Sequence, residues 1–212
     1  MKVRNLIGVL TSILITGAVA SCGGNPPAGG ISTYVMEAEY INLDGIQGAG
    51  LSSDQGGVEM IYGEGTAEHK AKWSNGYYVG YTHSADLQLD FVFNSSSNNT
   101  ANLVLRLGSE LGDIILNSTT FAVKVNGNAL NYGNLSIPNS GGEADMVCYD
   151  KPIAMPISIL EGENTISLVV LENTFKYGRE TGGPCVDCIK IMTSSDLTWE
   201  DKTDNPSRRG EI

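Results

Sequence analysis

The amino-acid sequence predicts an all-β fold, and three of its features lead to that prediction. Apolar and polar side chains largely alternate along residues 87–93, which is the pattern of a strand with one buried face. Further short runs, rich in β-branched residues and bounded by turn residues, follow at regular intervals. No stretch has the periodicity of a three-turn helix. An antiparallel β-sandwich is the simplest architecture that buries such strands.

The predicted strands share this short, apolar, turn-bounded character. They are residues 87–93, 103–107, 121–125, 153–159, 165–171 and 186–191. Asn126-Gly127 follows the third of them and predicts a tight hairpin, because both central residues of a type I′ turn need positive φ. Pro156 lacks an N–H group, so we expect its strand to lie at a sheet edge or to carry a bulge.

Composition limits the classes of function. The chain has 212 residues, 41% hydrophobic and 17% charged, which predicts one globular domain with a sizeable core. Its net charge of −11 argues against a nucleic-acid partner, since phosphate binding depends on clustered Lys and Arg. The sequence has no nucleophile elbow, zinc-protease motif, phosphate-binding loop or EF-hand loop. We therefore predict that the protein is not an enzyme and has no catalytic residues.

The N-terminus has the features of an export signal. Lys2 and Arg4 precede an apolar run at residues 6–20, which is too short to cross ~30 Å of hydrocarbon. The run ends in Val19-Ala20-Ser21-Cys22, which resembles the site at which bacterial lipoproteins are cleaved and lipidated. We predict a signal peptide over 1–21, lipidation of Cys22 and a flexible tether over 22–32. The alternative is an ordinary signal peptide followed by a chance cysteine.

This reading places the protein in the bacterial cell envelope, anchored to a membrane by lipid. Gly23 follows the cysteine where inner-membrane retention signals usually have Asp, so we expect the outer membrane. Disulfides persist in such an oxidising compartment, and Cys148, Cys185 and Cys188 are available for one pair and one thiol. Cys185 and Cys188 have half of a zinc-site spacing, but the sequence has no second such pair.

Two acids lie close together near the start of the predicted domain. Glu37 and Glu39 flank one alanine within the apolar stretch 34–41. Residues i and i+2 of a strand share a face, so the two carboxylates are expected to converge. Their repulsion needs a proton or a cation to offset it, and oxygen ligands suit Ca²⁺. A solvent-facing acidic pair is the alternative.

Five sequence blocks occur in an order that resembles carbohydrate-binding module families 6 and 35. The blocks are residues 36–40, 75–91, 125–127, 161–168 and 182–191. The resemblance implies a galactose-binding-type jelly roll of eight or nine strands over residues 33–193. Residues 194–212 are polar and unpatterned, which predicts a tail, and Trp199 either packs on the sandwich or belongs to a short partner-binding segment. The resemblance also implies that the protein binds a polysaccharide or another glycan without cleaving it.

The resemblance further implies particular site residues. In these families a structural calcium ion lies where the first and last strands meet, and its acidic ligands match Glu37, Glu39 and Asp187. An aromatic ring at the loop tips forms one wall of the sugar site, and it matches Tyr81. Candidates for a second wall are Trp73, Tyr149, Tyr177 and the pair Tyr77 and Tyr78, of which one is expected to belong to the core.

The chain also departs from the family pattern. Cys185 occupies the position of an Asn that hydrogen-bonds to sugar hydroxyls, and Cys148 lies near the position of the second aromatic wall. A Cys148–Cys185 disulfide is the natural implication, with Cys188 as the remaining thiol. The departures keep two other functions open. One is a structural or assembly lipoprotein with an envelope protein partner and no sugar site. The other is a small carbohydrate-active enzyme.

Overall fold

A computed structural model describes most of the predicted domain. The described residues are 30–44, 46, 61–80, 82, 85–110, 112–142, 145–172, 175–176, 179–180 and 183–208. The predicted signal peptide, Cys22, most of the tether, Tyr81 and Tyr177 lie outside them. No helix within the described part of the chain has the length and apolarity needed to cross a membrane.

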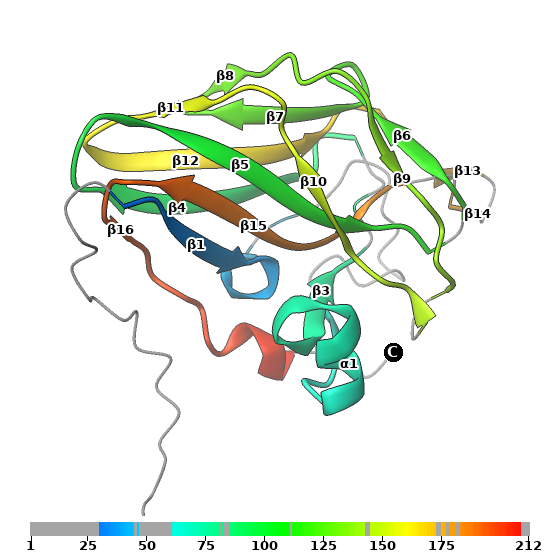
Figure 1. Ribbon diagram of the computed structural model, residues 1–212. Helices are drawn as coiled ribbons and strands as arrows, with labels where there is room; N and C mark the ends of the chain where they lie inside the picture. The colour runs from blue at the N-terminus through cyan, green and yellow to red at the C-terminus, as the bar shows by residue number, and fades with distance from the viewer. Residues whose placement is uncertain are drawn as a thin grey trace, which may run out of the picture.

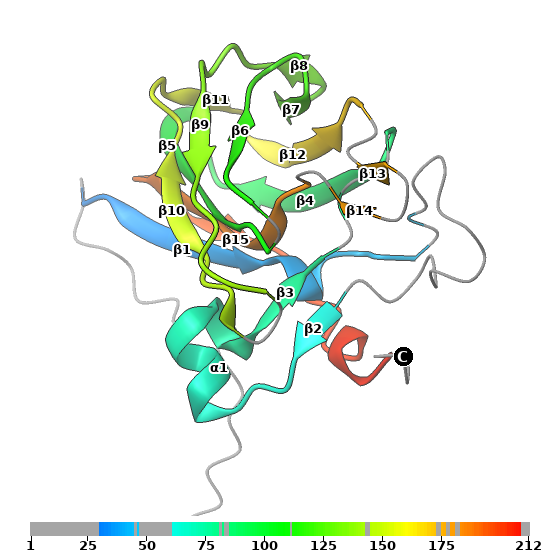
Figure 2. The ribbon, with the colours of Figure 1, turned by 90° about the vertical axis from the view of Figure 1, so that its right-hand side faces the viewer.

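Two antiparallel sheets stack on each other, which confirms the predicted all-β sandwich (Figures 1 and 2). The larger sheet has the order β10-β5-β15-β3-β2, with β1 also paired to β15 and β11 also paired to β5. Its strands are β1 (Ser32–Glu37), β2 (Ile61–Gly63), β3 (Tyr77–Val79), β5 (Asn99–Gly108), β10 (Tyr149–Pro152), β11 (Ile157–Ile159) and β15 (Cys185–Thr193).

The smaller sheet has the order β16-β4-β12-β7-β8. Its strands are β4 (Gln88–Ser95), β7 (Phe121–Val125), β8 (Asn128–Ala129), β12 (Gly162–Val170) and β16 (Leu197–Thr198). Two separate strand pairs are β6 (Ile114–Leu116) with β9 (Leu135–Ile137), and β13 (Phe175–Lys176) with β14 (Arg179–Glu180). The helical segments are short: η1 (Ala38–Tyr40), α1 (Ala67–Lys72), η3 (Ser74–Gly76) and η5 (Asn205–Arg208).

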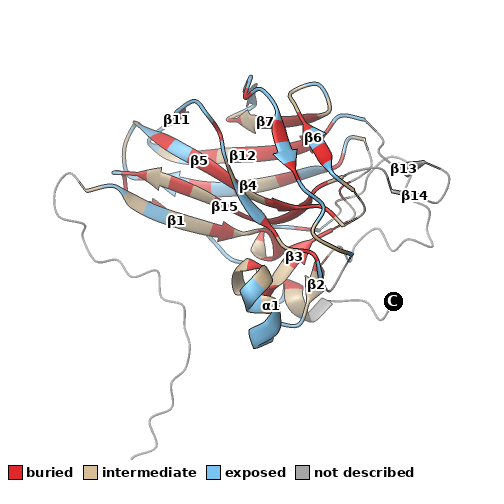
Figure 3. Cartoon of the chain, turned by 45° about the vertical axis from the view of Figure 1, so that its right-hand side comes forward, coloured by how far each residue is buried: buried red, intermediate tan, exposed pale blue. Residues whose placement is uncertain are grey.

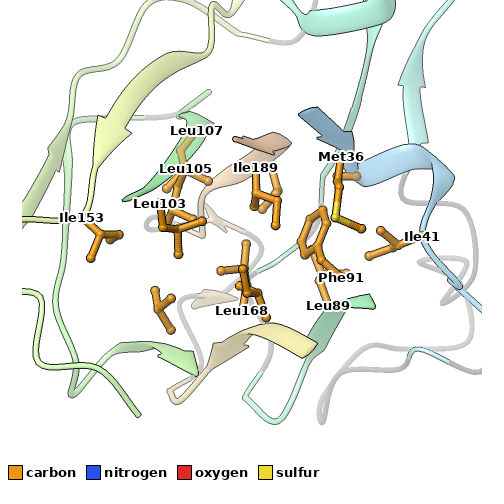
Figure 4. Close-up of a cluster of buried hydrophobic side chains, with 14 of the residues drawn as sticks. Met36, Ile41, Leu89, Phe91, Leu103, Leu105, Leu107, Ile153, Leu168 and Ile189 are labelled. Atoms are coloured by element: carbon orange, nitrogen blue, oxygen red, sulfur yellow. The ribbon is translucent and has the colours of Figure 1, made fainter. Parts of the chain in front are cut away.

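The core lies between the two sheets and follows from the alternating sequence pattern. Leu89 and Phe91 of β4 face Leu103 and Leu105 of β5 across the interior (Figure 4). Each of these side chains is at most 1% exposed, and buried and exposed positions alternate along β4. Figure 3 shows the same alternation on several strands of the sandwich. Each such residue contributes roughly 1.5–3 kcal/mol of transfer free energy, so the pattern is enough to select the buried face.

The predicted hairpin at Asn126-Gly127 is confirmed. These residues have φ of 50° and 78°, and the turn joins β7 to β8. The Asn126 amide also donates to Asn164 Oδ1 at 2.9 Å, and its Oδ1 accepts from the Thr165 N–H at 2.9 Å. Pro156 lies between β10 and β11, which pair separately with the same side of β5. The predicted single strand is thus interrupted before Ile157.

Residues 194–208 pack on the sandwich, which agrees with the packed alternative for Trp199 and not with a free tail. Leu197 is 4% exposed, and β16 pairs with β4. The Lys202 N–H donates to the Tyr40 carbonyl at 2.7 Å, and the Asn205 amide donates to the Ile41 carbonyl at 2.6 Å. One buried leucine and several satisfied backbone groups are sufficient to hold a polar segment in place.

Candidate metal centre and ligand groove

Strand β15 brings the two ends of the domain together, as the resemblance implied. Its outer edge pairs with β1 from Cys188 onward and with β3 at Val186. Between these two residues the register against β5 shifts by one, so Asp187 is the extra residue of a β-bulge. A bulge redirects the side chain that it carries. Asp187 therefore lies between the β15 residue that pairs with the end of β1 and the one that pairs with β3. Figure 2 shows β1, β3 and β15 close together.

The Asp187 carboxylate is completely buried and fully hydrogen-bonded. The Ser74 N–H donates to Oδ1 at 2.9 Å and to Oδ2 at 3.0 Å. The Nε of Arg106, on β5, donates to Oδ2 at 2.5 Å. Another guanidinium nitrogen donates to the Lys72 carbonyl at 3.2 Å, which fixes the orientation of Arg106. Asp187 thus joins the central strand to the segment that follows α1.

Glu37 and Glu39 converge on this same segment, although not in the way the strand pattern predicted. β1 ends at Glu37, and Glu39 lies in the 3₁₀ turn η1. The Ser74 hydroxyl donates to Glu37 Oε1 at 2.7 Å, and the Asn75 amide donates to Glu39 Oε1 at 3.2 Å. Asn75 has φ of 55°, a left-handed conformation that Asn tolerates better than most residues. Ser74 and Asn75 thereby contact all three acids.

The three carboxyls have unusual protonation equilibria. Burial raises the pKa of Glu37 to about 7 and that of Asp187 to about 7, despite hydrogen bonds and the Arg106 charge that act the other way. Burial and then the charge of Glu37 raise the pKa of Glu39 to about 9. A group of acids that resists ionisation in this way favours either protons or a bound cation.

The residues fit a divalent cation. Oε2 of Glu37 and Oε2 of Glu39 are buried and have no hydrogen-bond partner. Buried carboxylate oxygens without partners are costly, and coordination would satisfy them. Three ionised acids against the single charge of Arg106 leave a net charge of −2, which one divalent ion neutralises. Hard oxygen donors of this kind suit Ca²⁺. Among the described residues, the group whose ligand atoms all lie within 4.8 Å of one another comprises Glu37, Asp187 and Cys188, and it does not include Glu39.

The sequence analysis did not identify several residues of this centre. A ligand atom of Cys188 lies within 4.8 Å of ligand atoms of both Glu37 and Asp187. Burial and the Asp187 charge raise the pKa of the Cys188 thiol, so it stays protonated and the carboxylates remain the better donors. Arg106, Ser74 and Asn75 were also missed. An arginine within the apolar run 103–107 was the available signal, because a buried strand carries a charge only when it has a partner.

Several side chains that were expected around the sugar slot pack in one buried cluster. Trp73 is 2% exposed and donates its indole N–H to the Met146 carbonyl at 2.8 Å. Its assignment as a binding wall was therefore wrong, because a fully packed ring offers no face to a ligand. Tyr78 is also buried, as expected for one member of its pair, and donates to Glu110 Oε1 at 2.5 Å. These two rings pack in one cluster with Met146, Cys148 and Cys185.

The predicted Cys148–Cys185 disulfide was also wrong, since both side chains are separate buried thiols. Cys185 pairs with Gly108 on one side of β5, and the pairing of Tyr149 with Leu107 places Cys148 beside Gly108 on the other side. Two strand spacings separate the cysteines, about 10 Å, whereas a disulfide requires Cα atoms within about 7 Å. The strand β5 therefore lies between the two cysteines.

The remaining aromatic candidates have different outcomes. Tyr149 begins β10 and is 36% exposed, with the Lys151 Nζ 5.7 Å from its ring centroid. It is accessible, and it does not line the groove described below. Tyr81 and Tyr177 lie outside the described residues, so their roles stay predictions.

A groove of about 600 Å³ lies beside the acidic centre, and Glu37 lines both. Outward-facing residues of β4, among them Asp90, Val92 and Asn94, form part of its lining. Trp199 and its neighbours in the C-terminal segment contribute a second part. The Trp199 ring is half-buried, packs edge-on against Tyr34 at 6.2 Å, and donates its N–H to Asp201 at 2.9 Å. Sequence reasoning missed this groove because part of it consists of the segment predicted to be a tail.

No family model and no curated protein matches this sequence. Among solved structures, the chain is similar to a family 35 carbohydrate-binding module from an environmental isolate, with a TM-score of 0.46, 14% identity and coverage of 74% of this chain and 91% of that one. For a family 35 module from Clostridium thermocellum the TM-score is 0.44 and the identity 18%, over 76% of this chain and 97% of that one. For a Podospora anserina GH26-CBM35 β-(1,4)-mannanase the TM-score is 0.48 and the identity 16%, over 76% of this chain and 27% of that one. At these values, the assignment of the fold rests on the strand pairing described above.

Proposed function

We propose that this protein binds a polysaccharide or another glycan, without cleaving it, in the groove beside Trp199. The groove is the single observation that carries the proposal. It combines an aromatic ring with amide and carboxylate side chains, including Asn94 and Asp90. A sugar presents an apolar C–H face that packs on a ring, and hydroxyls that need fixed hydrogen-bond partners. The sequence resemblance to carbohydrate-binding modules supports the same class of ligand.

A calcium ion held by Glu37, Glu39 and Asp187 is the second part of the proposal. When bound, such an ion supplies positive charge that lets the buried acids ionise without mutual repulsion. Glu37 and Glu39 come from the start of the domain, and Asp187 comes from its last long strand. The ion would therefore stabilise the closure of the sandwich and, through Glu37, one end of the groove.

The third part concerns location. Lipidation of Cys22, after removal of residues 1–21, would anchor the domain in the cell envelope through a short tether. An anchored binding domain holds a glycan near the membrane without chemistry of its own. Metabolic labelling with a fatty acid, compared between the full chain and Cys22→Ser, tests this part. Label that survives the substitution excludes Cys22 as the anchor.

Affinity electrophoresis of the calcium-loaded domain against a panel of polysaccharides tests the binding function. We expect Trp199→Ala to abolish retardation by the polysaccharide that retards the wild type. Because Trp199 also packs on Tyr34, a second variant, Asn94→Ala, removes only an exposed amide of the groove. Tyr149→Ala removes an exposed ring outside the groove and is the matched control. Retardation unchanged in both groove variants would exclude the groove, and Tyr81→Ala would then test the position that the resemblance implied.

A structural or assembly lipoprotein is the second candidate, and the burial of Trp73, Cys148 and Cys185 favours it. Trp73, Cys148 and Cys185 pack together where the family resemblance placed the sugar site. Cross-linking in intact envelopes separates the two functions. A stoichiometric protein partner, together with no retardation by any polysaccharide, would support the assembly role.

A further inference from the structure

The groove beside Trp199 is strongly acidic. Six of its lining residues are acids and one, Lys202, is basic. The acids are Glu37, Asp44, Asp90, Glu163, Glu200 and Asp201. With all of them ionised the lining has a formal charge of −5, and a divalent ion at the Glu37 end would still leave −3. The lining of the groove is thus net negative, with six acids against one base.

Neutral groups donate hydrogen bonds to three of these carboxylates, those of Glu37, Asp90 and Asp201. The Gln88 amide donates to both oxygens of Asp90, at 2.9 and 3.0 Å, and the Trp199 indole donates to Asp201. Lys202 lies 3.9 Å from Glu200, which is a long and exposed ion pair. No salt bridge between described residues involves Asp90 or Glu163. The negative charges of Asp90 and Glu163 therefore remain available to a ligand.

Asp90 and Glu163 also lie in positions that suit contact with one ligand. Asp90 is on β4 and Glu163 on β12, and the pairing of Glu163 with Asn94 places both acids on the same pair of neighbouring strands. The aromatic ring of Trp199 lines the same hollow. A ligand lying along the groove would contact Trp199 together with several carboxylates.

We infer that the glycan bound in this groove is an amino-sugar polymer with free ammonium groups. The inference rests on the glycan-binding function proposed above and names its substrate class. A cationic sugar gains charge-assisted hydrogen bonds to the carboxylates, whereas a uronate or sulfated polymer would be repelled by them. A neutral sugar of the same backbone keeps the ring contact and loses the ionic contribution.

Calorimetry with matched oligosaccharides, on the whole protein in calcium and mildly acidic buffer, tests the inference. The probes are an oligomer of glucosamine, the same oligomer after complete N-acetylation, and an oligomer of galacturonate. We expect the free-amine oligomer to bind about tenfold more tightly than its acetylated form, with added salt reducing this difference. The galacturonate oligomer should show the weakest binding.

Two variants separate the groove from the general charge of the protein. The double variant Asp90→Asn with Glu163→Gln should lower affinity for the free-amine oligomer about tenfold and leave the acetylated oligomer nearly unchanged. Glu161→Gln is the matched control, because Glu161 is an exposed acid two residues from Glu163 and does not line the groove. It should affect neither ligand.

The outcomes separate the amino-sugar inference from the glycan-binding function on which it rests. Equal or tighter binding of the acetylated or uronate oligomer rejects the amino-sugar inference and leaves glycan binding intact. Binding of none of the three oligomers, nor of any polysaccharide in the panel, rejects both. Equal losses in the double variant and in Glu161→Gln would mean that a protein of net charge −11 attracts any polycation, which also rejects the inference.

Discussion

Arg106 and Asp187 form an ion pair in which one partner is completely buried. The Nε of Arg106 lies 2.5 Å from Asp187 Oδ2, and the side chains are 24% and 0% exposed. The pair links β5 to the bulge of β15 and supplies a permanent positive charge to the acidic centre. A cation bound there would therefore have to neutralise mainly Glu37 and Glu39.

Replacement of Arg106 should destabilise the protein strongly. Arg106→Gln leaves the Asp187 carboxylate buried without its cation, and loss of one partner of such a pair costs about 3 kcal/mol. Urea unfolding in the presence of a chelator measures the effect. Lys70→Gln, on the exposed face of α1, is the control and should change the unfolding free energy by less than about 0.5 kcal/mol. Equal effects of the two substitutions would contradict a structural role for the pair.

Stability without metal should fall as the pH rises. The pKa values of Glu37 and Asp187 are raised to about 7 and that of Glu39 to about 9, from ordinary values of 4.5 and 3.8. A carboxyl whose pKa is raised on folding stabilises the folded state below its unfolded pKa, and this contribution is lost as the pH rises through the folded pKa. The predicted window runs from about pH 4 to about pH 9.

Calcium should reverse this loss. Melting temperatures measured in EDTA should be lower at about pH 8 than at about pH 5, and added Ca²⁺ should raise the value more at about pH 8. Glu39→Gln removes the charge of the acid with the highest pKa, so its melting temperature should depend less on pH in EDTA. A melting temperature that EDTA leaves unchanged at about pH 8 would contradict the proposed metal centre.

Two substitutions of Asn75 separate its backbone role from its side-chain role. The residue has φ of 55°, and its amide donates to Glu39 at 3.2 Å and to the Tyr40 hydroxyl at 2.9 Å. Asn75→Ala loses these hydrogen bonds and is strained, whereas Asn75→Gly loses only the bonds. We expect the alanine variant to be less stable than the glycine variant by about 1 kcal/mol in denaturant unfolding. The reverse order would show that the conformation is not maintained in solution.

Gly108 should tolerate no side chain. A Cβ at this position would lie 2.1 Å from Met146 Sδ and 3.0 Å from Cys148 Sγ. Gly108→Ala therefore overpacks the cluster around Trp73 and should cost about 1–3 kcal/mol. Gly112→Ala is the control, because a Cβ there meets nothing within 4 Å. Thermal unfolding that does not distinguish the two variants would disprove the close packing of sulfur atoms over β5.

The local sequence pattern predicted those parts of the fold that depend on neighbouring residues alone. The alternation of residues 87–93 follows from which side of β4 meets the core, and Asn126-Gly127 forms its hairpin because both residues adopt positive φ. The prediction that Glu37 and Asp187 lie close together came from the order of sequence blocks, which resembles that of a known family. Pattern alone contains no information on pairs that are 150 positions apart in the chain.

The sequence by itself determined the β-sandwich, the strands β4, β5, β7, β12 and β15, and the acids near its two ends. The tertiary structure decided which side chains meet. Only the register of β15 makes Asp187 a bulge residue facing Arg106, and only the position of β5 between β10 and β15 keeps Cys148 and Cys185 apart. The groove depends likewise on where residues 197–202 pack. Strand order and register are settled by the burial of the whole core, so no single segment encodes them.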